Sequence, residues 1–221
     1  MSAPTLTQDG ELFVVSFGDD LNTTDHGWVS GMNEILDEVE AVAGPKVLLT
    51  TGAGKHYSNG LDVEWMAGKP SEDIVTYVNS VEKVLARILT FPAPTVAAVN
   101  GHAFGAGAFA LLAHDHVVMR EDRGFVCWPE VHLGMTFSRG LLTMIEELLV
   151  SAVARDAIVT GHRYSAPEAV TAGFVDRAVP LDELMTAAAG LGLPLAATAE
   201  SSVGRIKRQL HRRVTDALGT A

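Results

Sequence analysis

The stretch 100–134 contains glycines, a helix start and a carboxylate at a spacing that could do chemistry. Gly101, Gly105 and Gly107 let the backbone turn sharply and let another group approach it closely. A helix that begins near Gly105 leaves the N–H groups of its first turn, including that of Ala106, pointing outward with the positive end of the helix dipole behind them. Such a turn suits an anion, or an oxygen that becomes one. The alternative is that the small residues only let the helix pack tightly on a sheet.

One carboxylate, Glu130, follows the glycines within the segment Trp128-Pro-Glu-Val-His-Leu-Gly134. Its apolar neighbours Trp128, Pro129, Val131 and Leu133 predict that its pKa is raised toward working pH, which makes a carboxylate a stronger base. The alternative is a glutamate at a strand end, exposed to water.

A second glycine-rich loop spans Gly52-Ala-Gly-Lys-His-Tyr-Ser-Asn-Gly-Leu-Asp62. Gly54-Lys55 suggests a phosphate loop, but Leu49 stands where the first glycine belongs and His56 where Ser or Thr belongs, so this interpretation fails. Gly60 is placed to expose the N–H of Leu61, and Asp62 could cap the backbone that follows. Taken alone, this is an ordinary loop at a strand end.

Strands alternate with long helices in the elements that must position these loops. Apolar runs predict strands at 11–17, 46–51, 96–99 and 114–119, and three- and four-residue apolar steps predict helices at 24–43 and 71–90. After Gly134 the pattern is helical, with predicted helices at 138–149, 151–160, 165–173, 181–197 and 201–218. The chain is therefore expected to be a single α/β domain with a helical C-terminal portion.

The composition of the chain excludes several classes of partner and location. The 221 residues carry a formal net charge of −11, which argues against nucleic acid as a partner because phosphate contacts need a basic surface. No apolar run is long enough to span a membrane, and no signal peptide is indicated. The single cysteine, Cys127, fits a reducing compartment, so a cytoplasmic protein is expected.

Three further kinds of site have some support in the residue pattern. Gly105-Ala-Gly-Ala-Phe-Ala110 fits a dinucleotide fingerprint, with Glu121 or Asp122 loosely where a ribose ligand would lie, but it leaves the Leu61 loop and Glu130 unexplained. Cys127 with His132 as base is a weak nucleophile candidate, because a buried apolar cysteine is commoner. A metal site at 114–116 (His-Asp-His) is disfavoured, since adjacent residues on a strand point to opposite faces.

The three ordered segments Tyr57-Ser-Asn-Gly-Leu-Asp62, Asn100-Gly-His-Ala-Phe-Gly-Ala-Gly107 and Trp128-Pro-Glu-Val-His-Leu-Gly134 together resemble the crotonase, or enoyl-CoA hydratase/isomerase, superfamily. The resemblance extends over 11–179, including the segment 161–176. It implies a crotonase-like spiral of ββα units, with a core domain at 1–180 and a C-terminal helical segment of the same domain at 181–221 for trimerisation or as a lid. It also implies a homotrimer or a dimer of trimers.

The resemblance implies that the amides of Leu61 and Ala106 form an oxyanion hole for the thioester oxygen of an acyl-CoA substrate. Hydratases of the family have one catalytic glutamate at the position of Phe109 and another at that of Glu130, and this sequence keeps only the second. A single base is the pattern of the 3,2-enoyl-CoA isomerases, and the run 54–65 is most similar to the shorter plant-type members. The expected substrate-binding residues are Ser58, Asn59, Gly60, Asp62, Trp65, Gly105, Phe109, Met135 and Phe137.

No metal and no cofactor are expected, because coenzyme A is part of the substrate. Hydration, thioester hydrolysis, dehalogenation, decarboxylation and acyl-CoA binding without turnover are also compatible with the same superfamily. The basic residues of the last predicted helix, among them Arg205, Lys207 and Arg212, could contact the CoA phosphates or form a solvated face.

Overall fold

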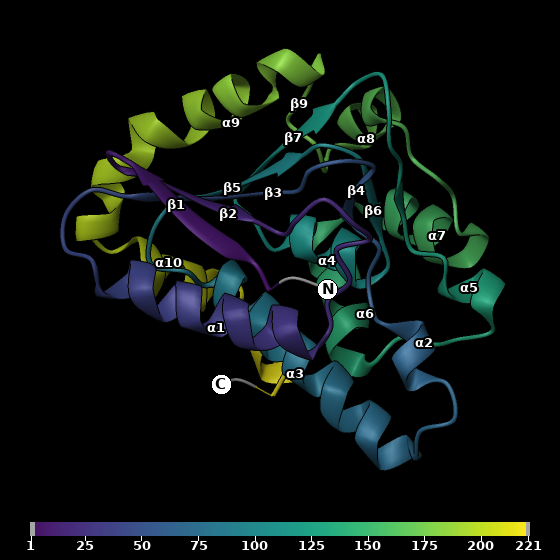
Figure 1. Cartoon of the computed structure of the whole chain (residues 1–221). Helices are drawn as coiled ribbons and strands as arrows, with labels where there is room; N and C mark the ends of the chain where they lie inside the picture. The colour runs from purple at the N-terminus through teal and green to yellow at the C-terminus, as the bar shows by residue number, and fades with distance from the viewer. Residues whose placement is uncertain (1–2, 220–221) are drawn as a thin grey trace.

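A six-stranded sheet forms the centre of the protein in the computed structural model, which describes residues 3–219 (Figure 1). Its strand order is β1-β2-β3-β5-β7-β9. β1 and β2 form an antiparallel hairpin, and the remaining neighbours are parallel. The strands are β1 (Thr5–Asp9), β2 (Leu12–Ser16), β3 (Val47–Thr51), β5 (Thr95–Val99), β7 (His116–Arg120) and β9 (Arg177–Val179).

A second, smaller sheet contains three parallel strands in the order β4-β6-β8. These are β4 (His56–Ser58), β6 (His102–Phe104) and β8 (Val126–Cys127). Each follows a strand of the large sheet along the chain and precedes a helix, so the chain repeats a ββα unit and places one strand in each sheet per turn. This is the spiral of ββα units that the resemblance implies, and the fold class is confirmed.

Helices cover both faces of the large sheet, and strand alternation explains the two cores. In β3 the side chain of Leu48 joins the larger core with α1 and α3, whereas Val47 and Leu49 join a smaller core with α9. Figure 1 shows α9 on one side of the sheet and α1 and α3 on the other. The helices are α1 (His26–Ala41), α2 (Val63–Met66), α3 (Ser71–Leu89), α4 (Ala106–Leu112), α5 (Glu130–Leu133), α6 (Arg139–Leu148), α7 (Ser151–Thr160), α8 (Ala166–Ala172), α9 (Leu184–Gly192), α10 (Val203–Leu210) and α11 (Arg212–Ala217).

The C-terminal portion is helical, but the two long helices predicted there are wrong. The first is divided into the 3₁₀ turn η1 (Leu181–Glu183), α9 and the 3₁₀ segment η2 (Leu193–Glu200). Pro194 lies at the start of η2, where it lacks the N–H that an α-helix would need. The second helix is divided at His211, whose φ and ψ of −97° and 17° lie outside the helical region.

None of the helices within residues 3–219 is long and apolar enough to cross a bilayer.

Candidate functional site

The three segments singled out in the sequence meet at the carboxyl ends of the three parallel strands of the small sheet. Leu61 lies three residues after the end of β4, Ala106 two residues after β6, and Glu130 three residues after β8. Parallel strands end at the same edge of their sheet, which is where open α/β folds bind ligands. The small sheet therefore places all three residues at one edge.

Gly60 brings the first loop into backbone contact with the second. A Cβ on Gly60 would lie 2.5 Å from the carbonyl oxygen of Phe104 and 3.1 Å from the amide nitrogen of Ala106, and φ at Gly60 is +84°. A side chain would therefore be both strained and in collision, so only glycine fits this position. The same absence of a side chain at Gly107 lets α4 approach β4, because a Cβ there would lie 2.4 Å from the carbonyl oxygen of Ser58.

Hydrogen bonds fix the directions of the two amides. The carbonyl of Gly60 accepts from the N–H of Thr24 at 2.8 Å, so the Leu61 N–H, on the other side of the same planar peptide group, points away from Thr24. The carbonyl of Gly105 accepts from two N–H groups of α4, so the Ala106 N–H points out of the helix. Neither amide donates to an acceptor within residues 3–219, which leaves both available to a ligand.

The Glu130 carboxylate lies beside this pair of loops. Its Oε1 would be 3.4 Å from a Cβ on Gly105, and its Oε2 is buried with no hydrogen-bond partner in the described part of the chain. Burial raises the pKa of Glu130 to about 7. The predicted cause needs a correction, because Val131 and Leu133 are 46% and 58% exposed. The one-turn helix α5 leaves these two side chains exposed to solvent, whereas Trp128 is fully buried, so Val131 and Leu133 do not account for the burial of the carboxylate.

The predicted acyl-pocket residues lie in two separate groups. Phe109 is fully buried, and its ring centroid lies 6.1 Å from that of Trp128 and 6.0 Å from that of Phe137. Met135 is partly exposed two residues before Phe137. Trp65 instead packs edge-on against His26 and Tyr77, behind the Leu61 loop. A cavity of about 150 Å³ lies at this second group, lined by Asp25, His26, Gly27, Asp62, Trp65 and Tyr77.

The remaining loop residues have structural contacts. The hydroxyl of Ser58 accepts from the Gly60 N–H at 3.3 Å, and the N–H of Asn59 donates to the carbonyl of Leu21. Asp62 caps α2 by accepting from the N–H of Trp65, as its position in the sequence predicts. Thr24 and Tyr77 contact this loop, and neither stands out in the sequence, because Thr24 lies in the irregular segment before α1 and Tyr77 is an ordinary buried position of α3.

The three polar residues considered as metal ligands bind separate partners. His114 is buried, its two ring nitrogens bonded to the Thr50 hydroxyl and the Ala110 carbonyl, and burial lowers its pKa to about 4. Asp115 pairs with Lys207, whereas His116 pairs with Asp176. Among the residues that the structure describes, no group of three or more His, Cys, Asp or Glu side chains could hold a metal ion.

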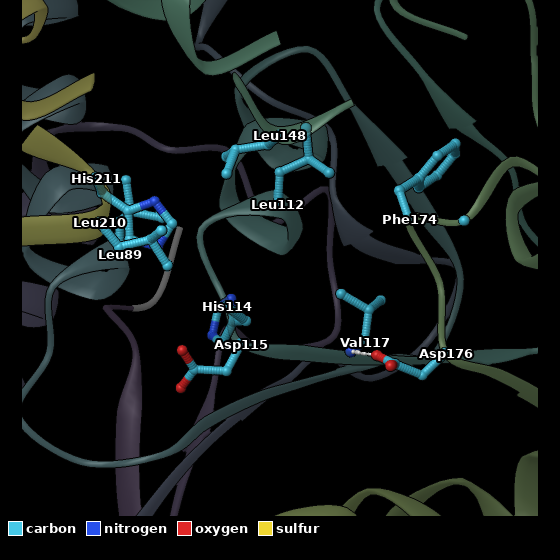
Figure 2. Close-up of a pocket in the computed structure, with 11 residues that line it drawn as sticks. Leu89, Leu112, His114, Asp115, Val117, Leu148, Phe174, Asp176, Leu210 and His211 are labelled. Atoms are coloured by element: carbon cyan, nitrogen blue, oxygen red, sulfur yellow. Dashed lines mark hydrogen bonds between the residues drawn. The ribbon is translucent and has the colours of Figure 1, made fainter. Parts of the chain in front are cut away.

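His114 and Asp115 line a second cavity of about 330 Å³, which is drawn in Figure 2. It lies near the amino end of β7, away from the carboxyl ends of the small sheet, and Leu112, Leu148, Phe174 and His211 also contribute to its lining (Figure 2).

The geometry supports neither a cysteine nucleophile nor a dinucleotide site. Cys127 is buried, and burial raises the pKa of its thiol, so the thiolate needed for nucleophilic attack is disfavoured. The glycines of 105–107 follow β6 of the small sheet rather than the preceding strand of the large sheet, so they are not the first strand-to-helix turn of a dinucleotide-binding unit.

Comparison with known proteins agrees with this geometry. The family model described as enoyl-CoA hydratase/isomerase matches residues 10–221. The chain is 33% identical to enoyl-CoA delta isomerase 3 of Arabidopsis thaliana over 87% of this chain and 84% of that protein. It is also 33% identical to a putative enoyl-CoA hydratase of Thermus thermophilus over 80% of this chain and 70% of that protein.

A solved structure shows the same fold. The crystal structure of a probable enoyl-CoA hydratase from Mycobacterium tuberculosis superposes with a TM-score of 0.88 and covers 98% of this chain and 91% of that one. At 22% identity this similarity speaks to the fold alone.

Proposed function

The chain belongs to the enoyl-CoA hydratase/isomerase family, whose members act on CoA thioesters, and from this premise we propose that it is a 3,2-enoyl-CoA isomerase. The observation that carries the proposal is the meeting of two unpaired amides, at Leu61 and Ala106, with one buried carboxylate whose pKa is about 7. One carboxylate with two fixed N–H donors is what moving a double bond along a thioester requires.

The two amides would bind the thioester oxygen of a 3-enoyl-CoA. A C–H next to a thioester carbonyl becomes removable when fixed donors meet the charge that develops on the oxygen. The donor at Ala106 has the dipole of α4 behind it, and the donor at Leu61 would meet the same oxygen from the other loop, whose Gly60 lies against the amide nitrogen of Ala106. Loss of one such donor typically costs about 10²–10³ in rate.

Glu130 would move the proton. As a carboxylate it takes the proton from C2, which leaves a dienolate whose oxygen is held by the Leu61 and Ala106 amides. As a carboxylic acid it then returns the proton at C4, which gives the conjugated 2-enoyl-CoA. A pKa near 7 suits both steps, because a group that titrates near working pH serves as base and as acid.

The choice between isomerisation and hydration depends on Phe109. Water addition in this family uses a second carboxylate at that position, and Phe109 is a buried aromatic residue packed against Trp128 and Phe137. The resemblance to a plant delta isomerase over most of both chains favours the same choice. Hydration is the second candidate, supported by the resemblance to a putative hydratase.

The other parts of the proposal follow from the same site. Phe109, Met135 and Phe137 would line the acyl group, whereas Ser58, Asn59, Gly60, Asp62 and Gly105 would shape the two turns. Trp65, which lies with Tyr77 behind the Leu61 loop, would bound the site on that side. The reaction uses no cofactor beyond the coenzyme A of the substrate. A homotrimer or dimer of trimers assembled through residues 181–221, in the cytoplasm, is part of the proposal.

Ultraviolet absorbance of the conjugated thioester tests the reaction. The purified protein is incubated with 3-hexenoyl-CoA and, in parallel, with 2-hexenoyl-CoA. Isomerisation predicts that the conjugated signal rises with the first substrate and stays constant with the second. Loss of signal from 2-hexenoyl-CoA would show hydration, and a flat signal with both would contradict either activity.

A further inference from the structure

Thr24 and Tyr77 hold the turn that carries the Leu61 amide from one side. The N–H of Thr24 donates to the Gly60 carbonyl at 2.8 Å, and the N–H of Asp62 donates to the Tyr77 hydroxyl oxygen at 2.9 Å. The Tyr77 hydroxyl in turn donates to the Thr24 carbonyl at 2.8 Å. These three bonds form a closed circuit through Thr24 and Tyr77.

This circuit fixes both peptide groups that flank Leu61. The preceding peptide group is held through the Gly60 carbonyl, and the following one through the Asp62 N–H. Because a peptide group is planar, holding one of its polar atoms sets the direction of the other. The Leu61 carbonyl accepts from Val63, so the Leu61 N–H is the polar group of this turn that stays without a partner within residues 3–219.

Tyr77 has the chemistry and the rigidity for this position. A hydroxyl has one proton to donate and lone pairs to accept with, so it can donate to Thr24 and accept from Asp62 simultaneously. Burial raises the pKa of Tyr77 to about 12, which keeps that proton in place. The ring is 1% exposed on the long helix α3, with ring centroids 5.0 Å and 5.1 Å from those of His26 and Trp65.

The second amide does not depend on a side chain in this way. Ala106 is the first residue of α4, and the helix itself holds the Gly105 carbonyl with two N–H groups. The Leu61 turn precedes only the four-residue helix α2. The Tyr77 side chain from α3 therefore helps to fix the direction of the Leu61 amide, whereas the backbone of α4 fixes that of the Ala106 amide.

We propose that Tyr77 is a positioning residue of the oxyanion hole, which sets the direction of the Leu61 amide through Asp62 and Thr24. This inference rests on the proposed role of Leu61. It does not depend on which reaction of the family follows, because every one of them would polarise the thioester carbonyl.

Tyr77→Phe tests the inference, because it keeps the ring contacts and removes only the hydroxyl. Two readouts are used: steady-state isomerisation of 3-hexenoyl-CoA, and the enolate absorbance of bound acetoacetyl-CoA, which reports polarisation of a thioester directly. The expected result is a fall in kcat of about 10–100-fold with KM changed by less than about twofold, together with a weaker enolate band.

Tyr57→Phe is the matched control. Tyr57 is also fully buried, and its hydroxyl bonds to the Thr50 hydroxyl rather than to the turn at Leu61. Both variants are expected to lose thermal stability by a similar amount, and only Tyr77→Phe is expected to lose kcat and the enolate band. Equal losses in both variants, or a Tyr77→Phe protein that behaves as the wild type, would overturn the inference.

The wild-type protein separates this inference from the proposed function. A wild-type protein that shows the enolate band but no isomerisation would contradict the isomerase proposal. The Tyr77→Phe and Tyr57→Phe variants could then still be compared by their enolate absorbance. A wild-type protein that shows neither signal would contradict both.

Discussion

Buried polar groups at the amino ends of the large sheet are hydrogen-bonded, whereas several of those at the carboxyl ends of the small sheet have no partner within residues 3–219. At the amino ends of β5 and β7, one oxygen of Asp115 accepts from the N–H and the hydroxyl of Thr95 and from Lys207, which also donates to the Ala93 carbonyl. His114 beside them uses both ring nitrogens. At the carboxyl ends of β4, β6 and β8, two amides and one oxygen of Glu130 have no partner within residues 3–219.

The presence or absence of hydrogen-bond partners distinguishes polar groups that stabilise the fold from those available to a ligand. Leaving a buried polar group unpaired costs free energy, so most buried groups in proteins are hydrogen-bonded, as they are around Asp115. Unpaired groups that collect at one edge of a sheet indicate a place where a ligand completes the hydrogen bonding. Substitutions at the two ends should therefore have opposite consequences for activity and for stability.

Glu130→Gln should give the largest effect on activity. Removal of the acid and base group is expected to lower kcat for 3-hexenoyl-CoA by about 10³–10⁴-fold, since general acid and base catalysis is used twice. The thermal midpoint should not fall, because the substitution removes a buried carboxylate of which one oxygen has no hydrogen-bond partner in the described part of the chain. Calorimetry beside the kinetic assay checks both, and an active or strongly destabilised variant would contradict the comparison.

Gly60→Ala should have the second-largest effect on activity, a loss of kcat of about 10²–10³-fold. The new methyl group would collide with the Phe104 carbonyl oxygen and displace the Leu61 amide. Gly44→Ala is the matched control. Gly44 also has a positive φ, +94°, but a Cβ there meets no atom within 4 Å. Steady-state kinetics should show full activity for the control, and a similar loss in both variants would mean that backbone strain alone explains the effect.

Asp115→Asn should affect stability instead. Leaving the buried Lys207 without its counter-charge is expected to lower the free energy of unfolding by about 3 kcal/mol, at the low end for a buried pair because Asp115 is partly exposed. Urea unfolding measures this change, and kcat should remain that of the wild type. Asp122→Asn, in an exposed pair with Arg120, is the control and should have little effect. A large loss of kcat in Asp115→Asn would remove the distinction between the two ends.

The sequence predicts the residues of the site better than their surroundings. Gly60, Gly105 and Glu130 stand out because a turn with positive φ and a lone carboxylate are local features that residue types reveal. The strands β4, β6 and β9 escape prediction because each has only three residues, too few for a hydrophobic period. The first strand, β1, escapes prediction because its sequence Thr-Leu-Thr-Gln-Asp contains a single apolar residue.

Long-range contacts account for the rest. Tyr77 bonds to Thr24 across 53 residues of sequence, and Lys207 bonds to Asp115 across 92, which no local pattern encodes. The prediction that Val131 and Leu133 surround Glu130 fails for a related reason, since apolar residues in a one-turn helix do not all face the core. Their apolar side chains predict burial, but the tertiary structure leaves both exposed to solvent.

The pH dependence of kcat/KM for 3-hexenoyl-CoA tests the central claim most directly, because the base must be ionised in the free enzyme. Burial raises the pKa of Glu130 in the folded protein to about 7, above its unfolded value, so its contribution to stability is present at low pH and is lost as pH rises through 7, while activity is gained over the same range. The account predicts that kcat/KM falls about tenfold per pH unit below a midpoint near 7. A profile that stays flat down to pH 5 would contradict it.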